Sequence, residues 1–114
     1  MARYVANQDE ALQHFLRKIE GVVGDRLQAV VLYGPRLDRQ NGGETAYNIL
    51  AILDAVSPDV RSTVEGLATQ MQSQHHVPFL VVAFSEEEQR LELRKPHWKK
   101  VREDGLVVWP RQQA

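Results

Sequence analysis

The sequence contains no cysteine, and this absence excludes several kinds of site. Disulfide scaffolds, thiolate zinc centres and cysteine nucleophiles all need a side chain that none of the 114 residues supplies. Long apolar runs are missing too. No stretch approaches the roughly 18 residues needed to span a bilayer, and the N-terminus lacks the apolar region of a signal peptide. We therefore expect a cytoplasmic protein.

The chain also lacks the patterns of common phosphate-binding, hydrolytic and metal sites. Gly34 has no partner glycine at the spacing of a Walker or dinucleotide loop. The serines have no histidine and acid at a spacing typical of a catalytic triad. His75 and His76 are adjacent, so their side chains diverge, and a cation at a helix end is the expected role. These patterns predict no metal and no cofactor.

The length and the apolar content of 43% predict one domain over residues 1–114. A net charge of −1 conceals an uneven distribution, because residues 1–88 carry 7 basic and 12 acidic side chains and residues 89–114 carry 7 basic and 3 acidic ones. The basic C-terminal quarter could contact an acidic partner or phosphates. A solvated helix face with a tail is the alternative interpretation.

Hydrophobic periodicity alternates between helical and strand-like segments along the chain. It predicts helices over 8–23, 58–74, from 85 onward and over 97–103, and strands over 28–33, 46–53, 79–84 and 106–109, with a polar loop over 36–44. Ser57 and Ser85 are expected helix caps, and Asn7 with Glu10 forms an expected capping box for the first helix. This order predicts an α/β (α+β) fold, a small mixed β-sheet with helices packed on it.

Three segments resemble, in the right order, motifs of the superfamily that includes polymerase beta and the minimal nucleotidyltransferase (MNT) proteins. Leu32-Tyr-Gly-Pro-Arg is similar to the family's Leu-Tyr-Gly-Ser motif, and Ala46-Tyr-Asn-Ile-Leu-Ala-Ile-Leu to its Asp-x-Asp strand. The segment from Trp98 to Trp109 is similar to the family's closing segment. The resemblance implies a nucleotidyltransferase-like fold. It also implies nucleotidyl transfer with two Mg²⁺ ions held by three aspartates.

The residues at the metal-binding positions differ from those of the family. The two aspartates correspond to Ala46 and Asn48, and the third falls within Phe79 to Val81, which is apolar. Alanine cannot ligate a cation, and a neutral amide oxygen binds Mg²⁺ more weakly than a carboxylate. Proline in place of the motif's serine also removes a hydroxyl and a backbone N–H. We therefore expect a catalytically inactive, degenerate member whose vestigial nucleotide and metal positions are Gly34, Pro35, Arg36, Ala46 and Asn48.

Polar side chains around these positions leave two interpretations open. Asn48 could hold the turn at Gly34 by hydrogen bonding, or it could contact a ligand. Arg36 and Arg39 could bind an anion, or they could be solvated loop charges.

The resemblance implies a binding or regulatory subunit that acts through self-association or a protein partner. In the family such domains pair with helical proteins, including the HEPN proteins of toxin–antitoxin modules, so the expected role is antitoxin-like. One alternative is an active nucleotidyltransferase that holds Mg²⁺ through displaced ligands such as Asp38 or Glu44. Another is a nucleic-acid-binding module that uses Trp98 with the basic residues Arg94, Lys95, Lys99, Lys100 and Arg102.

Overall fold

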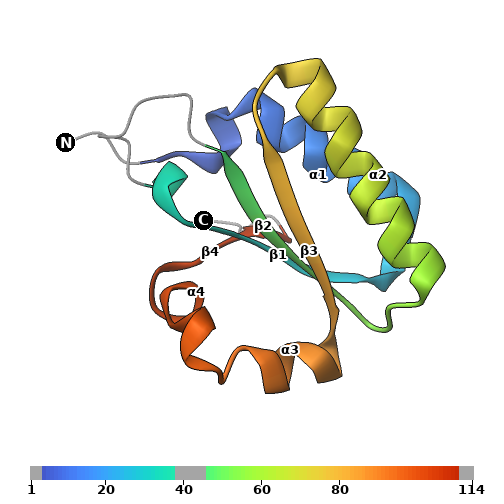
Figure 1. The fold of residues 1–114 in the computed structure, drawn as a ribbon. Helices are drawn as coiled ribbons and strands as arrows, with labels where there is room; N and C mark the ends of the chain where they lie inside the picture. Colours follow the sequence, from blue (N-terminus) through green and yellow to red (C-terminus); the bar gives the residue numbers. More distant parts are fainter. Residues whose placement is uncertain (1–3, 38–45, 111–114) are drawn as a thin grey trace.

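The computed structural model describes residues 4–37 and 46–110, which form a four-stranded sheet with helices on both faces (Figure 1). The helices are α1 (Glu10–Val23), α2 (Pro58–His75), α3 (Glu86–Glu92) and α4 (Lys99–Asp104), and the strands are β1 (Leu27–Tyr33), β2 (Tyr47–Leu53), β3 (Phe79–Ser85) and β4 (Leu106–Trp109). This order confirms the mixed α/β architecture. Among the described residues, no helix is long and apolar enough to cross a membrane.

The sheet is mixed, with its strands in the order β3-β2-β1-β4. β1 runs antiparallel to both β2 and β4, whereas β2 and β3 are parallel and α2 connects them. The register places Tyr33 opposite Asn48 in β2, and Asn48 beside Leu80 in β3. The sheet therefore brings three segments that are distant in sequence together at one end.

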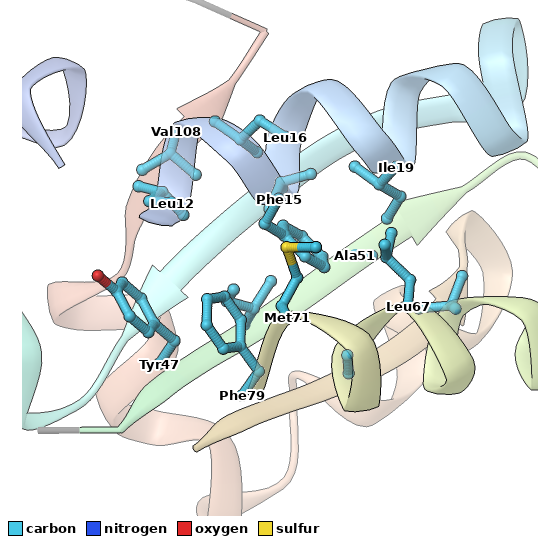
Figure 2. Packing of buried hydrophobic residues seen from close by; sticks show 14 of the residues in the cluster. Leu12, Phe15, Leu16, Ile19, Tyr47, Ala51, Leu67, Met71, Phe79 and Val108 are labelled. Atoms are coloured by element: carbon cyan, nitrogen blue, oxygen red, sulfur yellow. The ribbon is translucent and has the colours of Figure 1, made fainter. Parts of the chain in front are cut away.

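Helices α1 and α2 cover one face of the sheet, and α3 and α4 lie on the other (Figure 1). Side chains alternate along β2, so Tyr47, Ile49 and Ala51 join the cluster under α1 and α2 while Leu50 joins the cluster on the opposite face. Figure 2 shows Phe15, Met71 and Phe79 packed together in the first cluster. Burial on both faces explains why the central strands read as continuous apolar runs.

The ends of the helices confirm most of the expected caps and correct one. The Ser57 side chain accepts from the Val60 amide, and Ser85 forms a reciprocal capping box with Glu88. The expected capping box at Asn7 is wrong, because residues 6–8 form a 3-10 turn and α1 begins at Glu10, two residues later than that box requires. Asp9 is the actual cap, and its carboxylate accepts from the Leu12 amide at 3.3 Å.

Trp98 makes the main aromatic contacts between the C-terminal helices and the sheet. It is 8% exposed, and its ring meets Tyr33 and Phe84 edge-on at centroid distances of 5.9 and 5.6 Å.

We predict that Trp98→Ala lowers the free energy of unfolding by about 3–5 kcal/mol, because it leaves a cavity against the sheet. Urea denaturation measures the change. Lys100→Ala, at an exposed neighbour, should stay within about 0.5 kcal/mol of the wild type. Equal effects of the two substitutions would contradict the prediction.

Candidate functional site

The vestigial positions meet where β1 ends and where β2 and β3 begin. Gly34 directly follows β1, and Ala46 directly precedes β2. Asn48 and its neighbour Leu80 share the sheet face that carries Trp98, because parallel partners in register point the same way. Of the positions expected for the third aspartate, Phe79 to Val81, Leu80 is the one on this face, and it is 54% exposed.

Asn48 lies directly against the turn at Gly34. Gly34 has a φ of 87°, and a Cβ placed there would lie 3.0 Å from the Asn48 side-chain nitrogen. Both the left-handed backbone and this close approach therefore favour glycine at position 34. The contact favours the structural interpretation of Asn48, which packs against the turn and limits how it can move.

The side chains at these positions do not fit a pair of Mg²⁺ ions. Ala46, Asn48 and Leu80 together supply one amide oxygen and no carboxylate, whereas Mg²⁺ sites in proteins are built on carboxylates and phosphates. In the described ranges, no group of three histidine or acidic side chains could share a metal ion. The alternative ligands Asp38 and Glu44 lie outside the described residues, as does Arg39.

Arg36 binds to α1 and β2 on the other side of the turn. Its Nε is 3.4 Å from Asp9 Oδ2, its Nη2 donates to the Tyr47 hydroxyl at 2.7 Å, and its guanidinium lies 3.8 Å from the centre of the Tyr47 ring. The side chains of Arg36 and Asp9 are only 13% and 11% exposed. An anion at Arg36 would have to compete with Asp9. The sequence carries no signal for this contact between residues 27 positions apart.

Asp9 also accepts hydrogen bonds from two tyrosines, Tyr4 at 2.8 Å and Tyr47 at 2.5 Å. Burial disfavours the charged carboxylate. The bonds from Tyr47, Tyr4 and the Leu12 amide, together with the Arg36 charge, outweigh burial and lower the pKa of Asp9. Burial and the bond to Asp9 raise the pKa of both tyrosines, which stay protonated as donors. We call Tyr4, Asp9, Arg36 and Tyr47 the Asp9 cluster. It connects the Gly34 turn to the start of α1.

Three of the five cations proposed for nucleic-acid binding make contacts within the chain. Arg102 donates to the backbone carbonyls of Leu93 and Lys95, beyond the end of α3. The other cations are paired with glutamates or exposed: Lys95 with Glu92 at 2.7 Å, Lys99 with Glu103 at 3.9 Å, and Arg94 and Lys100 toward solvent. Trp98 is buried, so its ring does not offer a face on which a base could stack.

A second polar region lies between α1 and α2, where His14 Nδ1 is 2.9 Å from His75 Nε2. The two rings line a groove of about 590 Å³ together with Asn7, Glu10, Gln13 and Arg17. From the sequence, the adjacent residues His75 and His76 are expected to diverge and to place a cation at a helix end. In the fold His75 pairs with His14, and His76 ends α2 in a left-handed conformation. Burial, followed by the proximity of His75, lowers the pKa of His14.

Comparison with known proteins finds likeness at the level of structure. No family model matches the chain, and no curated protein matches it. A structure of the toxin–antitoxin MntA-HpeT, in a variant with two aspartates changed to glutamate, matches with a TM-score of 0.57 at 18% identity, over 89% of this chain and 75% of that chain. A toxin–antitoxin structure with AMP-PNP gives the same values. A variant with a tyrosine changed to alanine gives 0.56 at 18% identity, over 89% of this chain and 74% of that one.

The chain has a nucleotidyltransferase-like fold. The element order and the mixed sheet agree with the motif resemblance, and the structural matches cover most of the chain. At 18% identity the likeness concerns the fold and no finer property.

We predict that the Asp9 cluster stabilises the fold. Asp9→Ala should lower the free energy of unfolding by about 2–4 kcal/mol, because it removes a helix cap and leaves partly buried donors without an acceptor. Asp9→Asn keeps a capping oxygen and should lose less. Urea denaturation near neutral pH measures both.

A comparison of the wild type with Asp9→Asn tests the contribution of the charge on Asp9. Its pKa is lower in the folded than in the unfolded state, so its contribution is present above about pH 4 and is lost as the pH falls through the folded-state pKa. The wild type should therefore lose stability on acidification more steeply than Asp9→Asn. Parallel pH profiles would contradict the role of the carboxylate.

The histidine pair predicts a pH dependence in a different range. Because the pKa of His14 is lowered on folding, the unfolded chain binds this proton more readily. The stability contribution is complete above about pH 6.5 and should fall, by a small amount, as the pH drops below that value. His14→Gln should flatten this decline in thermal unfolding, whereas His76→Gln, outside the contact, serves as the control. An unchanged decline in His14→Gln would contradict the prediction.

Proposed function

We propose that this chain is a catalytically inactive nucleotidyltransferase-fold protein that acts as a binding or regulatory subunit. Its proposed role is antitoxin-like, with a HEPN-type helical protein as the class of partner. In this proposal the outer surfaces of the domain bind the partner, and the Gly34 turn with Asn48 has a structural role.

The replacement of all three carboxylate positions carries this proposal. Ala46, Asn48 and Leu80 lie together at one end of the sheet, and these are the positions that we assign to the carboxylates of an active two-metal site. Two-metal transfer depends on carboxylates that bridge and neutralise the ions, and these three positions carry no negative charge. Gly34-Pro35 adds to the loss, since proline has no N–H to offer a phosphate.

The structural neighbours support a role beside a protein partner, without showing its class. They are chains from toxin–antitoxin structures, one of them with AMP-PNP. In another, two aspartates one residue apart were changed to glutamate, and that spacing is the spacing of Ala46 and Asn48 here. In our proposal, this chain keeps the fold of such a protein and has lost the pair of aspartates.

The two alternatives receive less support from the described residues. An active enzyme would need Mg²⁺ ligands from Asp38 or Glu44, and no other acidic side chain meets Asn48 in the described contacts. A nucleic-acid-binding module would need free cations with an exposed aromatic ring. Trp98 is buried instead, and several of the cations are paired within the chain.

The proposal predicts that the wild-type protein transfers no nucleotide. Purified protein incubated with radiolabelled ATP or another nucleoside triphosphate, with Mg²⁺ or Mn²⁺, should label neither itself nor a co-expressed HEPN-type protein. The two proteins should still co-purify as a stoichiometric complex, and Asn48→Ala should leave that complex intact. Transfer by the wild type that Asn48→Ala abolishes would overturn the proposal.

A gain-of-function variant tests the reason for inactivity. The combined change Ala46→Asp with Asn48→Asp restores two carboxylates one residue apart, so it should acquire a Mg²⁺-dependent rise in melting temperature that the wild type lacks. Thr69→Asp with Ser73→Asp adds the same charge on the exposed side of α2 and controls for unspecific cation binding. An equal rise in melting temperature in both variants would contradict the prediction, because the two new carboxylates of β2 would then bind Mg²⁺ no better than carboxylates on the surface of α2.

A further inference from the structure

The outer edge of β3 is the feature of the surface that the proposed function does not use. β3 is the last strand of the sheet, with β2 on its inner side (Figure 1). Within the described ranges no strand pairs with its outer side. A groove of about 250 Å³ follows this edge, lined by Arg61, Val64, Glu65, Val81, Val82, Ala83, Phe84 and Glu88.

The register with β2 determines which backbone groups of β3 point outward. Tyr47 N donates to Pro78 O at 2.9 Å, so in this parallel ladder the even-numbered residues bond to β2 and the odd-numbered ones face away. Side chains from α2 and α3 confirm the direction, because they bind three odd-numbered positions: Gln72 Oε1 accepts from Phe79 N at 3.3 Å, Arg61 Nη2 donates to Ala83 O at 3.4 Å, and Glu88 Oε1 accepts from Ser85 N at 3.0 Å.

Four outward groups remain between these side-chain bonds. They are the N–H groups of Val81 and Ala83 and the carbonyls of Phe79 and Val81, and none of them has a hydrogen-bond partner among the described residues. An open edge of this kind is a template for another strand. The neighbouring side-chain bonds cover the two ends of the strand and leave its middle free.

These four groups are complementary to themselves. A two-fold axis beside Val81 would place β3 antiparallel to β3 of a second copy. Each Val81 N–H would then donate to the other Val81 carbonyl, and each Ala83 N–H to the other Phe79 carbonyl. All the free donors and acceptors are used once. Phe79 N–H and Ala83 C=O, which bond to Gln72 and Arg61, lie at the remaining positions of the same ladder. These two groups could replace their long side-chain bonds with backbone bonds to the second copy.

The same register accounts for the exposure of Leu80. This leucine is 54% exposed although it belongs to β3, where it lies next to Asn48 near the start of the strand. In the two-fold arrangement Leu80 lies opposite Val82 of the second copy, at a non-hydrogen-bonded position where facing side chains approach closely. Pairing would thus cover apolar surface as well as backbone groups.

We propose that β3 pairs antiparallel with β3 of a second copy of this chain, through an axis at Val81, to form one continuous sheet. The inference is independent of catalytic silence, since the β3 edge is formed by backbone groups whether or not the cleft binds metal. A second copy is favoured over an unrelated strand because the donors, the acceptors and the Leu80–Val82 contact all match under one symmetry operation.

The absence of cysteine allows a direct test with single-cysteine variants. At the axis the two Cα atoms of residue 81 would lie about 5.5 Å apart, within the roughly 4.4–6.8 Å that a disulfide spans. Val81→Cys should therefore form a covalent dimer rapidly under mild oxidation, as measured by non-reducing electrophoresis. Leu91→Cys, at a leucine of α3 that is 61% exposed, is the control and should cross-link far more slowly. Equal rates would overturn the proposal.

Sedimentation equilibrium provides a second, non-covalent measurement. The wild type should show a concentration-dependent mass that rises to twice that of the chain. Leu80→Lys should remain monomeric with an unchanged circular dichroism spectrum, because a lysine on the edge strand opposes pairing. Leu91→Lys should dimerise like the wild type. A wild type that stays monomeric at all concentrations, or a dimer that Leu80→Lys leaves intact, would overturn the proposal even if Val81→Cys fails to fold.

Discussion

The burial of β2 on both faces is the constraint on which the rest of this structure depends. Ile49, Leu50 and Ala51 are fully buried in succession, two of them under α1 and α2 and one under the C-terminal helices. A strand covered on both sides must carry apolar residues at every interior position, because an unpaired polar group there would cost several kcal/mol. Polar chemistry can therefore enter only at the strand ends. That is where Asn48 lies.

The positions expected for the metal ligands lie at such a strand end, and their side chains carry no charge. Three carboxylates in neighbouring strand positions would repel one another unless metal ions neutralised them. With Ala46, Asn48 and Leu80 at these positions the end of the sheet needs no cation, and Asn48 packs against the Gly34 turn instead. Leu80 is exposed beside the outer edge of β3. The same end of the sheet thus carries both the positions expected for the metal ligands and the strand edge proposed for pairing.

The opposite side of the turn is ordered by charge and hydrogen bonding. Asp9 caps α1 and at the same time accepts from Tyr4, Tyr47 and Arg36, so the cluster holds helix, strand and turn together. Arg36 and Asp9 are largely shielded from solvent, so removal of one would leave the other with an unsatisfied polar group. The guanidinium of Arg36 therefore stabilises the fold, and an anion could bind it only in competition with Asp9.

The amino-acid pattern by itself determined the helices, the strands and the caps at Ser57 and Ser85, because hydrophobic periodicity and cap chemistry act over only a few residues. It also indicated which positions differ from the aspartates of the motifs that the chain resembles. It misplaced the cap of α1, since Asp9 is favoured over Asn7 by contacts that come from Arg36 and Tyr47. Only the tertiary structure decided that Leu80 lies beside Asn48, that His75 meets His14, and that the free groups of β3 are complementary to themselves. Such pairings depend on strand register and helix packing, and these follow from the whole buried surface rather than from any local segment.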